Sequence, residues 1–330
     1  MTTADPFPTY ADLCARTDGR AGTAWGVFGA DDELGTLNHL TPERTLAALS
    51  SVRTGRVVNL NLGLDAFSPP LIAHRGTPEH TVFGLNAYHR DDRLDGLFPQ
   101  ASTQLDGLRH FAHPDFGFYN GVDGGELRAG TDVLGIQNVA ERGIVGRGVL
   151  LDVASYRESI GAPIDHAAAE GIPVADLEAT LRRQGSELRA GDVLLLRTGW
   201  LAWFRSLPRD PDAPLRSAGL EASEEVAAWL WDRRIAVAAA DNVALEAWPA
   251  TASRLATRAE QSGVLERSSH SGMLHRVLIP LLGLTIGELW DLEELAAACH
   301  ARGAFDLLVT AEPLAVRGGV GSPANALAVL

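Results

Sequence analysis

The chain has 330 residues, a hydrophobic content of 46% and a formal net charge of −14. A chain of this length and composition can bury a substantial core. Its acidity argues against nucleic acid or an anionic membrane as a partner, because both require a basic face. The sequence contains no lysine, which excludes a lysine Schiff base and a P-loop lysine.

Two cysteines, Cys14 and Cys299, are present. They are too few for a disulfide framework or a four-cysteine zinc site, so we interpret them as reduced thiols. The first residues contain acids and prolines and do not resemble a signal peptide. No apolar run reaches the roughly 18 residues of a membrane span. We therefore expect a cytoplasmic protein.

No internal repeat or low-complexity linker divides the chain. We expect residues 1–40 to form an N-terminal arm and residues 41–330 to form one compact catalytic domain. Thr41 followed by Pro42 predicts the start of a helix over residues 41–51, because threonine caps helices and proline favours the first helical position. Apolar alternation predicts a strand over residues 57–62.

Two later apolar runs, residues 148–153 and 192–197, have the length of buried strands. Helical spacing lies between them at residues 174–184. Two further helices are each followed by a strand: 222–233 then 235–240, and 292–301 then 304–309. This mixture of elements predicts the α/β class.

The densest group of polar side chains lies between Gln100 and Asn120. Gln104 and Asp106 have the i, i+2 spacing that places two side chains on one face of an extended segment. His110 follows four residues after Asp106, and His113 follows His110. A solvated loop is the plain alternative for such a segment.

Other motifs are weaker. The sequence has no Gly-x-Ser-x-Gly elbow, and Ser269-His270-Ser271 is a poor candidate for a nucleophile in a polar loop. The glycine-rich residues 318–323 lack the lysine and the strand–loop–helix context of a phosphate loop. We interpret them as a turn that shapes a pocket or ends a strand.

At the polar cluster the sequence resembles the cyclase family that includes kynurenine formamidase-like enzymes. The family signature is His-x-Gly-Thr-His-x-Asp-x-Pro-x-His. Here Gln100 and Gln104 occupy the first two histidine positions, and Asp106 and His110 keep the aspartate and the last histidine. Further blocks keep family order over nearly the whole chain: Trp25-Gly26, residues 32–38, 118–121, 191–192, 197–200 and 241–242, Glu246, and residues 274–276 and 318–325.

The resemblance implies an α/β, swivelling β/β/α fold and a homodimer or homotetramer. In metal-dependent members, histidines and the aspartate hold zinc or manganese, which activates water to attack a formamide, amide or lactam carbonyl. The family site also includes a histidine before the helix at 222–233 and an acid after the following strand. Ala218 occupies the first of these positions here, and Glu246 is the candidate for the second.

Amide oxygens are poor replacements for imidazole toward zinc or manganese. We therefore expect no tightly bound metal; if one is present, its candidate ligands are Gln100, Gln104 and Asp106. General acid–base chemistry then remains. Its candidate catalytic residues are Asp106, His110, Glu246 and His275, and its candidate substrate-binding residues are Gln100, Gln104, Arg109, Tyr119 and Asn120.

The sequence thus predicts an enzyme that cyclises, dehydrates or isomerises a small carbonyl-containing metabolite, in secondary metabolism, without a tightly bound cofactor. The first alternative is a metal-dependent amide, formamide or lactam hydrolase using zinc or manganese. The second is a catalytically inactive protein that binds a small molecule. Retention of Asp106, His110 and Glu246 argues against this last reading, because a pure binding protein needs no such set.

Overall fold

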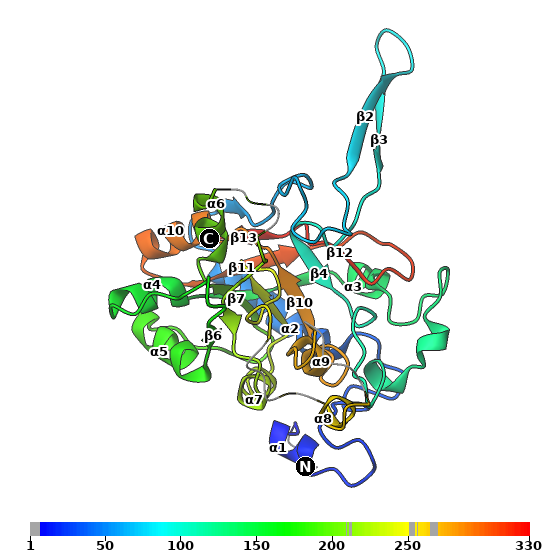
Figure 1. Cartoon of the computed structure of the whole chain (residues 1–330). Coiled ribbons are helices and arrows are strands. Elements are labelled where there is room, and N and C mark those ends of the chain that lie inside the picture. The colour runs from blue at the N-terminus through cyan, green and yellow to red at the C-terminus, as the bar shows by residue number, and fades with distance from the viewer. Residues whose placement is uncertain (1–6, 209, 211–212, 251–254, 256, 265–269) are drawn as a thin grey trace.

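The computed structural model of the protein describes residues 7–208, 210, 213–250, 255, 257–264 and 270–330. Its centre is a mixed sheet (Figure 1) with the strand order β1-β13-β11-β5-β7-β9-β10-β4-β12. Helices cover both faces of this sheet. The chain therefore has the α/β architecture that the sequence predicts.

Four parallel strands form the middle of the sheet. They are β5 (Ile144–Asp152), β7 (Val193–Arg197), β9 (Val237–Ala240) and β10 (Thr285–Glu288). Strands covered on both faces are apolar without alternation, which is why three of the four were visible as apolar runs. The predictions of strands near 148–153, 192–197 and 235–240 are confirmed.

Antiparallel strands extend the sheet on both sides. Beyond β10 lie β4 (Gln104–Asp106) and β12 (Gly321–Pro323). Beyond β5 lie β11 (Asp306–Ala311), β13 (Leu327–Val329) and β1 (Val57–Asn59). The predicted strands at 57–62 and 304–309 correspond to β1 and β11, and β4 corresponds to the extended segment expected at Gln104 and Asp106. Strands β10, β12 and β13 were not predicted, because short strands leave little periodicity.

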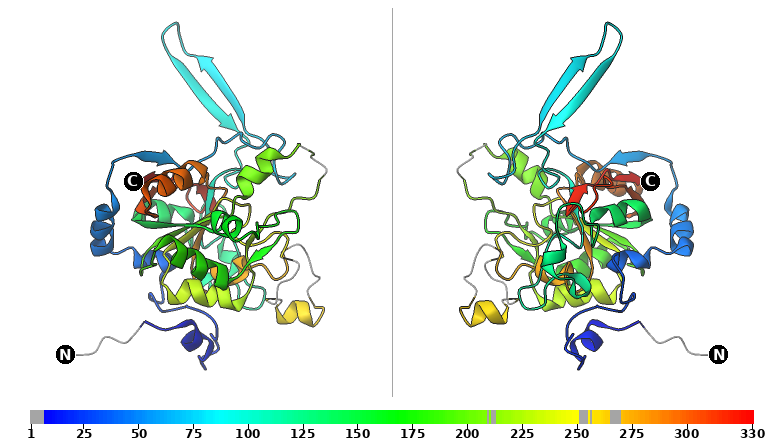
Figure 2. Two further views of the ribbon diagram at one scale, coloured as in Figure 1. Left: turned by 90° about the vertical axis from the view of Figure 1, so that its left-hand side faces the viewer. Right: turned by 90° about the vertical axis from the view of Figure 1, so that its right-hand side faces the viewer.

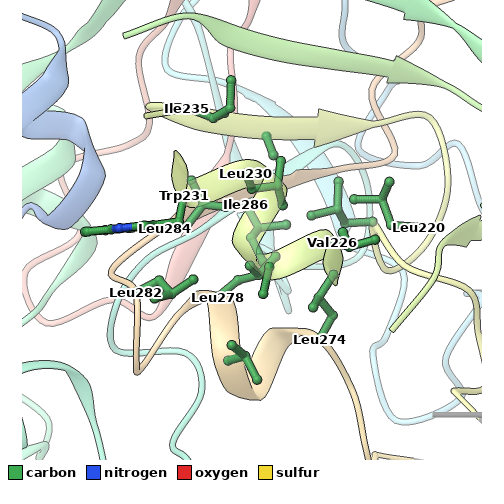
Figure 3. Packing of buried hydrophobic residues seen from close by; sticks show 14 of the residues in the cluster. Leu220, Val226, Leu230, Trp231, Ile235, Leu274, Leu278, Leu282, Leu284 and Ile286 are labelled. Atoms are coloured by element: carbon green, nitrogen blue, oxygen red, sulfur yellow. The ribbon is translucent and has the colours of Figure 1, made fainter. Parts of the chain in front are cut away.

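The helices pack against two apolar clusters, one on each face. On one face lie α5 (Val174–Gln184), α7 (Glu224–Asp232) and α9 (His275–Leu278). Figure 3 shows the packing between α7 and α9. On the other lie α3 (Ile136–Arg142) and α10 (Glu293–Arg302). Successive residues of β7 alternate between the two clusters, with Leu194 and Leu196 facing one and Val193 and Leu195 the other. The predicted helices at 174–184, 222–233 and 292–301 are confirmed.

The remaining elements lie at the periphery. The helices are α1 (Tyr10–Cys14), α2 (Pro42–Ala48), α4 (Val153–Ser159), α6 (Trp200–Ser206) and α8 (Arg258–Gln261). The strands are the hairpin β2 (Glu79–Gly84) and β3 (Arg90–Asp95), and the pair β6 (Gly171–Ile172) and β8 (Gly219–Leu220). At α2 the Thr41 hydroxyl accepts from the Arg44 amide, as the predicted cap requires. Each described helix is too short or too polar to cross a bilayer.

The segment before α2 packs onto the body of the molecule. The Trp25 indole donates to the carbonyl of Pro280 at 2.7 Å, and the Tyr10 amide donates to Asp232 at 2.7 Å. His39 is buried against the rings of Phe7 and Phe28, at centroid distances of 4.9 and 5.2 Å. This contact places a titratable group in an aromatic environment.

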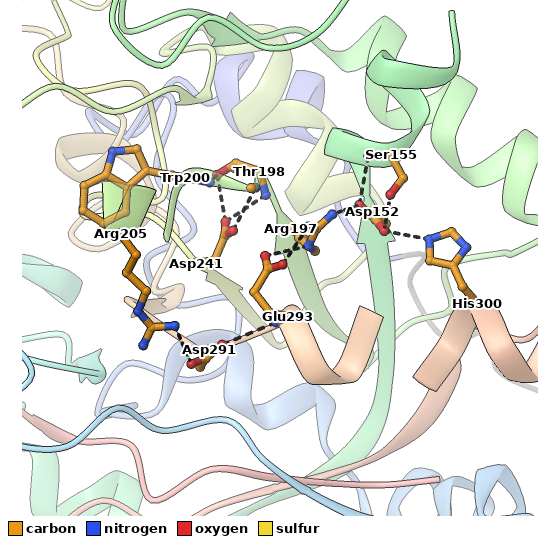
Figure 4. A network of polar contacts seen from close by, with 11 residues as sticks. Asp152, Ser155, Arg197, Thr198, Trp200, Arg205, Asp241, Asp291, Glu293 and His300 are labelled. Atoms are coloured by element: carbon orange, nitrogen blue, oxygen red, sulfur yellow. Dashed lines mark hydrogen bonds and ion pairs between the residues drawn. The ribbon is translucent and has the colours of Figure 1, made fainter. Parts of the chain in front are cut away.

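Carboxylates at the ends of the central strands form a polar network (Figure 4). Asp241, after β9, accepts from the amide and hydroxyl of Thr198 and from the amide of Gly199. Arg197, at the end of β7, pairs with Asp152 at the end of β5. The carboxyl ends of β5, β7 and β9 are therefore tied together.

Replacement of Asp241 by asparagine tests this network. Asp241 is fully buried, and an amide group would direct a donor at the N–H groups that its carboxylate now accepts. We expect Asp241→Asn to lower the free energy of unfolding by about 1–3 kcal/mol, measured by urea denaturation. Asp95→Asn, in an exposed ion pair with Arg93, serves as the control; equal losses in both variants would contradict the prediction.

A pH dependence follows from His39. Burial, aided by the charges of Arg44 and Arg234, lowers the pKa of His39 to about 4. The unfolded state, with a pKa near 6.5, binds the proton more tightly, so stability is lost as pH falls from about 6.5 toward 4. At pH 5 the loss from this one group is about 2 kcal/mol.

We expect His39→Phe to remove that part of the loss of unfolding free energy between pH 7 and pH 5. Urea denaturation at the two pH values measures it. His74→Phe, at an exposed position, is the matched control and should keep the wild-type pH dependence. An unchanged pH dependence in His39→Phe would show that His39 is not held neutral by burial.

Candidate active site

The register of three short strands builds the site. Strand β4 lies between β10 and β12 and is antiparallel to both, with Gln104 opposite Glu288 and Asp106 opposite Gly321. Gln104 and Asp106 share one face of β4, as their i, i+2 spacing predicts, while Leu105 points into the opposite apolar cluster. The pairing of β4 with β10 therefore brings Glu288 beside the predicted pair.

His275 lies at the centre of the site. It begins α9, is almost fully buried, and meets three carboxylates. Its Nδ1 is 2.8 Å from Glu246 Oε2, and its Nε2 is 3.0 Å from Glu288 Oε1 and 3.7 Å from Asp106 Oδ2. The bond at Nδ1 fixes the ring so that Nε2 faces the other two acids.

Several polar atoms in the site are buried without a hydrogen-bond partner among the described residues. They are both carboxylate oxygens of Asp106, Oε1 of Gln104 and Nε2 of Gln100. The Gln104 amide nitrogen donates to Glu288. Gly321 keeps the backbone close, since a Cβ there would stand 2.8 Å from Gln100 Nε2 and 3.3 Å from Asp106 Oδ1. Buried polar atoms normally have partners, so these unpaired atoms indicate a place for a ligand.

His110 lies on the more open side of the cluster. Its Nε2 is 3.8 Å from Asp106 Oδ1, and its side chain is 19% exposed. The ring of Phe111 packs against His110 and His275, with centroids 5.0 and 5.1 Å away. Burial lowers the pKa of His110, although the charge of Asp106 opposes the effect. A neutral imidazole beside a carboxylate is suited to take up and return a proton.

The charges of the cluster set the pKa values of its acids. Burial, together with the charge of Asp106, raises the pKa of Glu288 to about 7. Burial also opposes ionisation of Asp106, but the charges of His110 and His275 outweigh it, and the pKa of Asp106 lies below its usual value. Burial would lower the pKa of His275, yet Glu246 and the hydrogen bonds to the carboxylates hold it well above 6.5.

The three groups fit a divalent cation. Asp106, His275 and Glu288 each offer a ligand atom, and these atoms all lie within 4.8 Å of one another. Ligand atoms about 2.0–2.2 Å from a tetrahedral zinc ion stand roughly 3.3–3.6 Å apart, which is close to the 3.0 and 3.7 Å measured from His275 Nε2. Glu246 behind Nδ1 supplies the carboxylate–histidine arrangement typical of metal sites.

Three predicted substrate-binding residues lie elsewhere. The Arg109 guanidinium donates to the carbonyls of Arg128 and Thr131 and holds the loop before α3. The Tyr119 hydroxyl donates to the Asp32 carboxylate. The Asn120 side-chain amide donates to the Asp32 carbonyl and accepts from the Gly26 amide. The structure does not bring these three side chains to the Asp106 cluster, because the chain turns away after β4 and their polar groups are used in structural bonds.

The other predicted positions are as follows. Gln100, Gln104, Asp106, His110, Glu246 and His275 come together in one buried cluster. Ala218 is buried in the core and its carbonyl accepts from Asn242. His113 accepts from the Asp115 amide in its own turn, and Ser269 lies outside the described residues.

Two residues of the site were missed. Glu288 ends an apolar strand, and Arg75 lies before the β2–β3 hairpin, where its guanidinium donates to the Gln100 carbonyl. An acid inside the apolar stretch 277–292 was the available signal for Glu288. The sequence gives no such signal for Arg75, whose charge lowers the pKa of Asp106 and Glu288 as a lesser influence.

Comparison with known proteins identifies the family of the chain. The model of the family described as "Putative cyclase" matches residues 39–247. A crystal structure of a protein described as a novel cyclase shares 32% identity and a TM-score of 0.78, covering 93% of this chain and 99% of its own. No curated protein matches the chain.

More distant structures share the fold. Isatin hydrolase A from Labrenzia aggregata, bound to benzyl benzoate, has 15% identity and a TM-score of 0.55, with 87% of this chain and 98% of that chain covered. An isatin hydrolase bound to the product analogue thioisatinate has 16% identity and a TM-score of 0.51, with 88% and 99% covered. The family match and the 32% identity over nearly the whole length show that this chain belongs to the cyclase family.

Proposed function

We propose that the protein is a cyclase-family enzyme that hydrolyses an amide-type bond of a small carbonyl compound, with a divalent cation held by Asp106, His275 and Glu288. The observation that carries the proposal is the convergence of these three groups on one buried point, with Nδ1 of His275 already bound to Glu246. Two structural neighbours are named isatin hydrolases, which supports hydrolysis as the reaction class.

This proposal differs from the expectation of a metal-free site, and the reason lies in the residues considered. That expectation rests on Gln100, Gln104 and Asp106, of which only Asp106 is a strong ligand. His275 and Glu288 add an imidazole and a second carboxylate from distant parts of the chain. Three carboxyl groups are buried together around one histidine, and ionising all of them would bury excess negative charge, which is costly unless it is paired or coordinates a metal.

A bound divalent cation polarises a carbonyl oxygen and lowers the pKa of water. The residues of the chain supply the rest. Glu246 fixes the tautomer of His275, and His110, more exposed than its neighbours, accepts a proton and delivers it to the leaving nitrogen. Arg75 and Gln100 line one small cavity, and the side-chain amide nitrogen of Gln100, which has no partner among the described residues, can donate to a substrate oxygen. The ring of Phe111 packs against both imidazoles.

Metal-free acid–base chemistry on a carbonyl compound, such as cyclisation, dehydration or isomerisation, is the second candidate. It is favoured by the raised pKa of His275. A protonated His275 can neutralise part of the negative charge without a cation, leaving Asp106 and His110 as the proton-transfer pair. The two candidates differ in one measurable property, which is the binding of a metal.

Cation binding distinguishes the proposed hydrolase from metal-free acid–base chemistry. After dialysis against a chelator, we expect the protein to bind one equivalent of Zn²⁺ or Mn²⁺ in a calorimetric titration. Glu288→Gln should abolish this binding, because it removes a charged ligand. Glu246→Gln should weaken it by about 10- to 100-fold, the usual cost of losing a group that orients a ligand.

Glu294→Gln is the control, since Glu294 is exposed on α10, and it should bind like wild type. Melting temperatures show whether each variant is folded. A folded wild-type protein that takes up no cation would overturn the cation site and leave the acid–base candidate.

The role of His110 is tested by turnover. On a panel of small formamides, amides and lactams, we expect His110→Gln to lower kcat by about 100-fold or more, the usual contribution of general acid–base catalysis. Metal binding should persist, because His110 is not a ligand in the proposal. His113→Gln makes the same change three residues away and should retain activity. Equal rates for wild type and His110→Gln would assign proton transfer to another group.

A further inference from the structure

An apolar hollow lies beside helix α6, at the end of the molecule from which the β2–β3 hairpin projects (Figures 1 and 2). It is partly open to solvent and has a volume of about 130 Å³. Its walls include Leu71, Trp203, Phe204, Leu207 and Leu215. Leu207 is 41% exposed, so part of this apolar surface contacts water. Covering such a surface with an apolar group is favourable.

Contacts behind the walls hold the hollow in shape. The Phe204 ring stacks on Trp200, with centroids 4.8 Å apart, and the Trp203 ring packs on His166, with centroids 5.2 Å apart. The Trp200 indole donates to the Arg216 carbonyl at 2.8 Å, which ties the wall formed by the chain after α6 to the helix itself. The walls are therefore fixed by packing, as is usual for sites that take small molecules.

A narrow cavity, which we call the neck, adjoins the hollow. It has a volume of about 10 Å³ and shares Pro70, Leu71 and Leu215 with the hollow. Its other walls are Ile72, Arg75, Gln100, Ala101, Val243 and Leu289. A space of this size holds about one water molecule, so a slender group fits it and a branched one does not.

Two residues of the neck adjoin the candidate active site. Leu289 directly follows Glu288 and belongs to the apolar cluster that also includes walls of the hollow. Gln100 lies beside Asp106, since a Cβ on Gly321 would stand 2.8 Å from Gln100 Nε2 and 3.3 Å from Asp106 Oδ1. The same Nε2 is buried and has no hydrogen-bond partner among the described residues. The hollow, the neck and the site therefore follow one another, with an unused N–H donor at the inner end.

We propose that the hollow is a substrate subsite, which takes a neutral apolar group of about the size of a phenyl ring. An unbranched linker in the neck joins this group to the amide-type bond at the Asp106 cluster. The nature of the reacting bond rests on the proposed function, whereas the hollow and the neck rest on their own geometry. The substrate class is an amide-type compound that carries a remote phenyl or short alkyl group.

The size and the walls of the hollow determine the class of group that it takes. An apolar protein cavity of about 150 Å³ holds benzene, so a volume of about 130 Å³ suits one ring or a short alkyl chain. A charged group would lose its hydration against the apolar walls. Asp210 and Arg216 also line the hollow, but their charges are opposite and favour neither sign. The neck adds a selection by shape, because a substituent on the linker would meet its walls.

Ligand-observed NMR titrations of the full chain test the proposal, and a repeat after dialysis against a chelator measures binding without turnover. The probes are primary amides in which one to five methylene groups join the carboxamide to a phenyl ring. Each is compared with the alkyl amide of the same linker length. Once the linker spans the neck, we expect the phenyl compound to bind about 10- to 100-fold more tightly than its alkyl partner, the usual effect of burying an aromatic group. Shorter compounds should lack this phenyl effect.

Two kinds of variant separate the hollow from the neck. Leu207→Asp places a charge in the wall of the hollow, and Ala101→Leu fills the neck; each should abolish the phenyl effect and leave the shortest amide unchanged. Val243→Leu repeats the neck test at a second wall residue, and melting temperatures show whether each variant is folded. Ile160→Asp is the matched control, because Ile160 is 52% exposed and, like Leu207, is the C-cap of a short helix. It should keep the phenyl effect.

A phenyl effect that is absent from wild type, or that persists in Leu207→Asp, overturns the subsite. A phenyl effect lost in Leu207→Asp but kept in both neck variants overturns the connection between the hollow and the site. These outcomes are separate from those of the proposed function. A protein that shows the phenyl effect but takes up no cation contradicts the metal-dependent hydrolase alone, and one that hydrolyses short amides without the phenyl effect contradicts the subsite alone.

Discussion

The hydrogen bond between Glu246 and Nδ1 of His275 is the contact on which the site depends. Without it the imidazole could rotate, and Nε2 would not be committed to the space between Asp106 and Glu288. The bond joins the loop after β9 to the first residue of α9, so the position of a short helix becomes part of the chemistry. Leu274, just before α9, and Leu278, at its end, anchor this helix in the core against α7. Packing and the hydrogen bond therefore act together to hold the ring.

A second constraint is the register of β4 against β10. A shift of one residue would turn Gln104 and Asp106 into the apolar cluster that Leu105 now fills. The burial of Leu105 and Ile286 on their respective faces fixes that register. The same core that stabilises the sheet thus determines that two acids from opposite strands meet, and it forces them to share one imidazole.

The sequence was sufficient for the parts of the structure with long periodic patterns. The helix at 174–184 and the strands at 148–153 and 192–197 were visible because their burial repeats over many residues. The face shared by Gln104 and Asp106 followed from strand alternation alone. Glu288 and Arg75 were not predictable in this way, since their proximity to Asp106 arises from pairing and loop closure over long separations. Arg109, Tyr119 and Asn120 show the converse, because nearness in sequence did not place them in the site.

In the cation site proposed above, the glutamines at positions 100 and 104 would change which metal is preferred, but they would leave the three ligands in place. The family signature covers candidate ligands in one segment only. The three candidate ligands of this protein, Asp106, His275 and Glu288, come from β4, α9 and β10. With amides in place of imidazoles, the donor atoms around the cluster become mostly oxygen. Oxygen donors suit manganese and magnesium better than zinc, while imidazole suits zinc. The two carboxylates attract any divalent cation, so the substitutions act less on the total charge of the site than on its preference among metals. A cation held there would lower the pKa of water, and a weaker Lewis acid would leave more of the proton transfer to His110. His110 lies at the more open side of the cluster, and burial lowers its pKa.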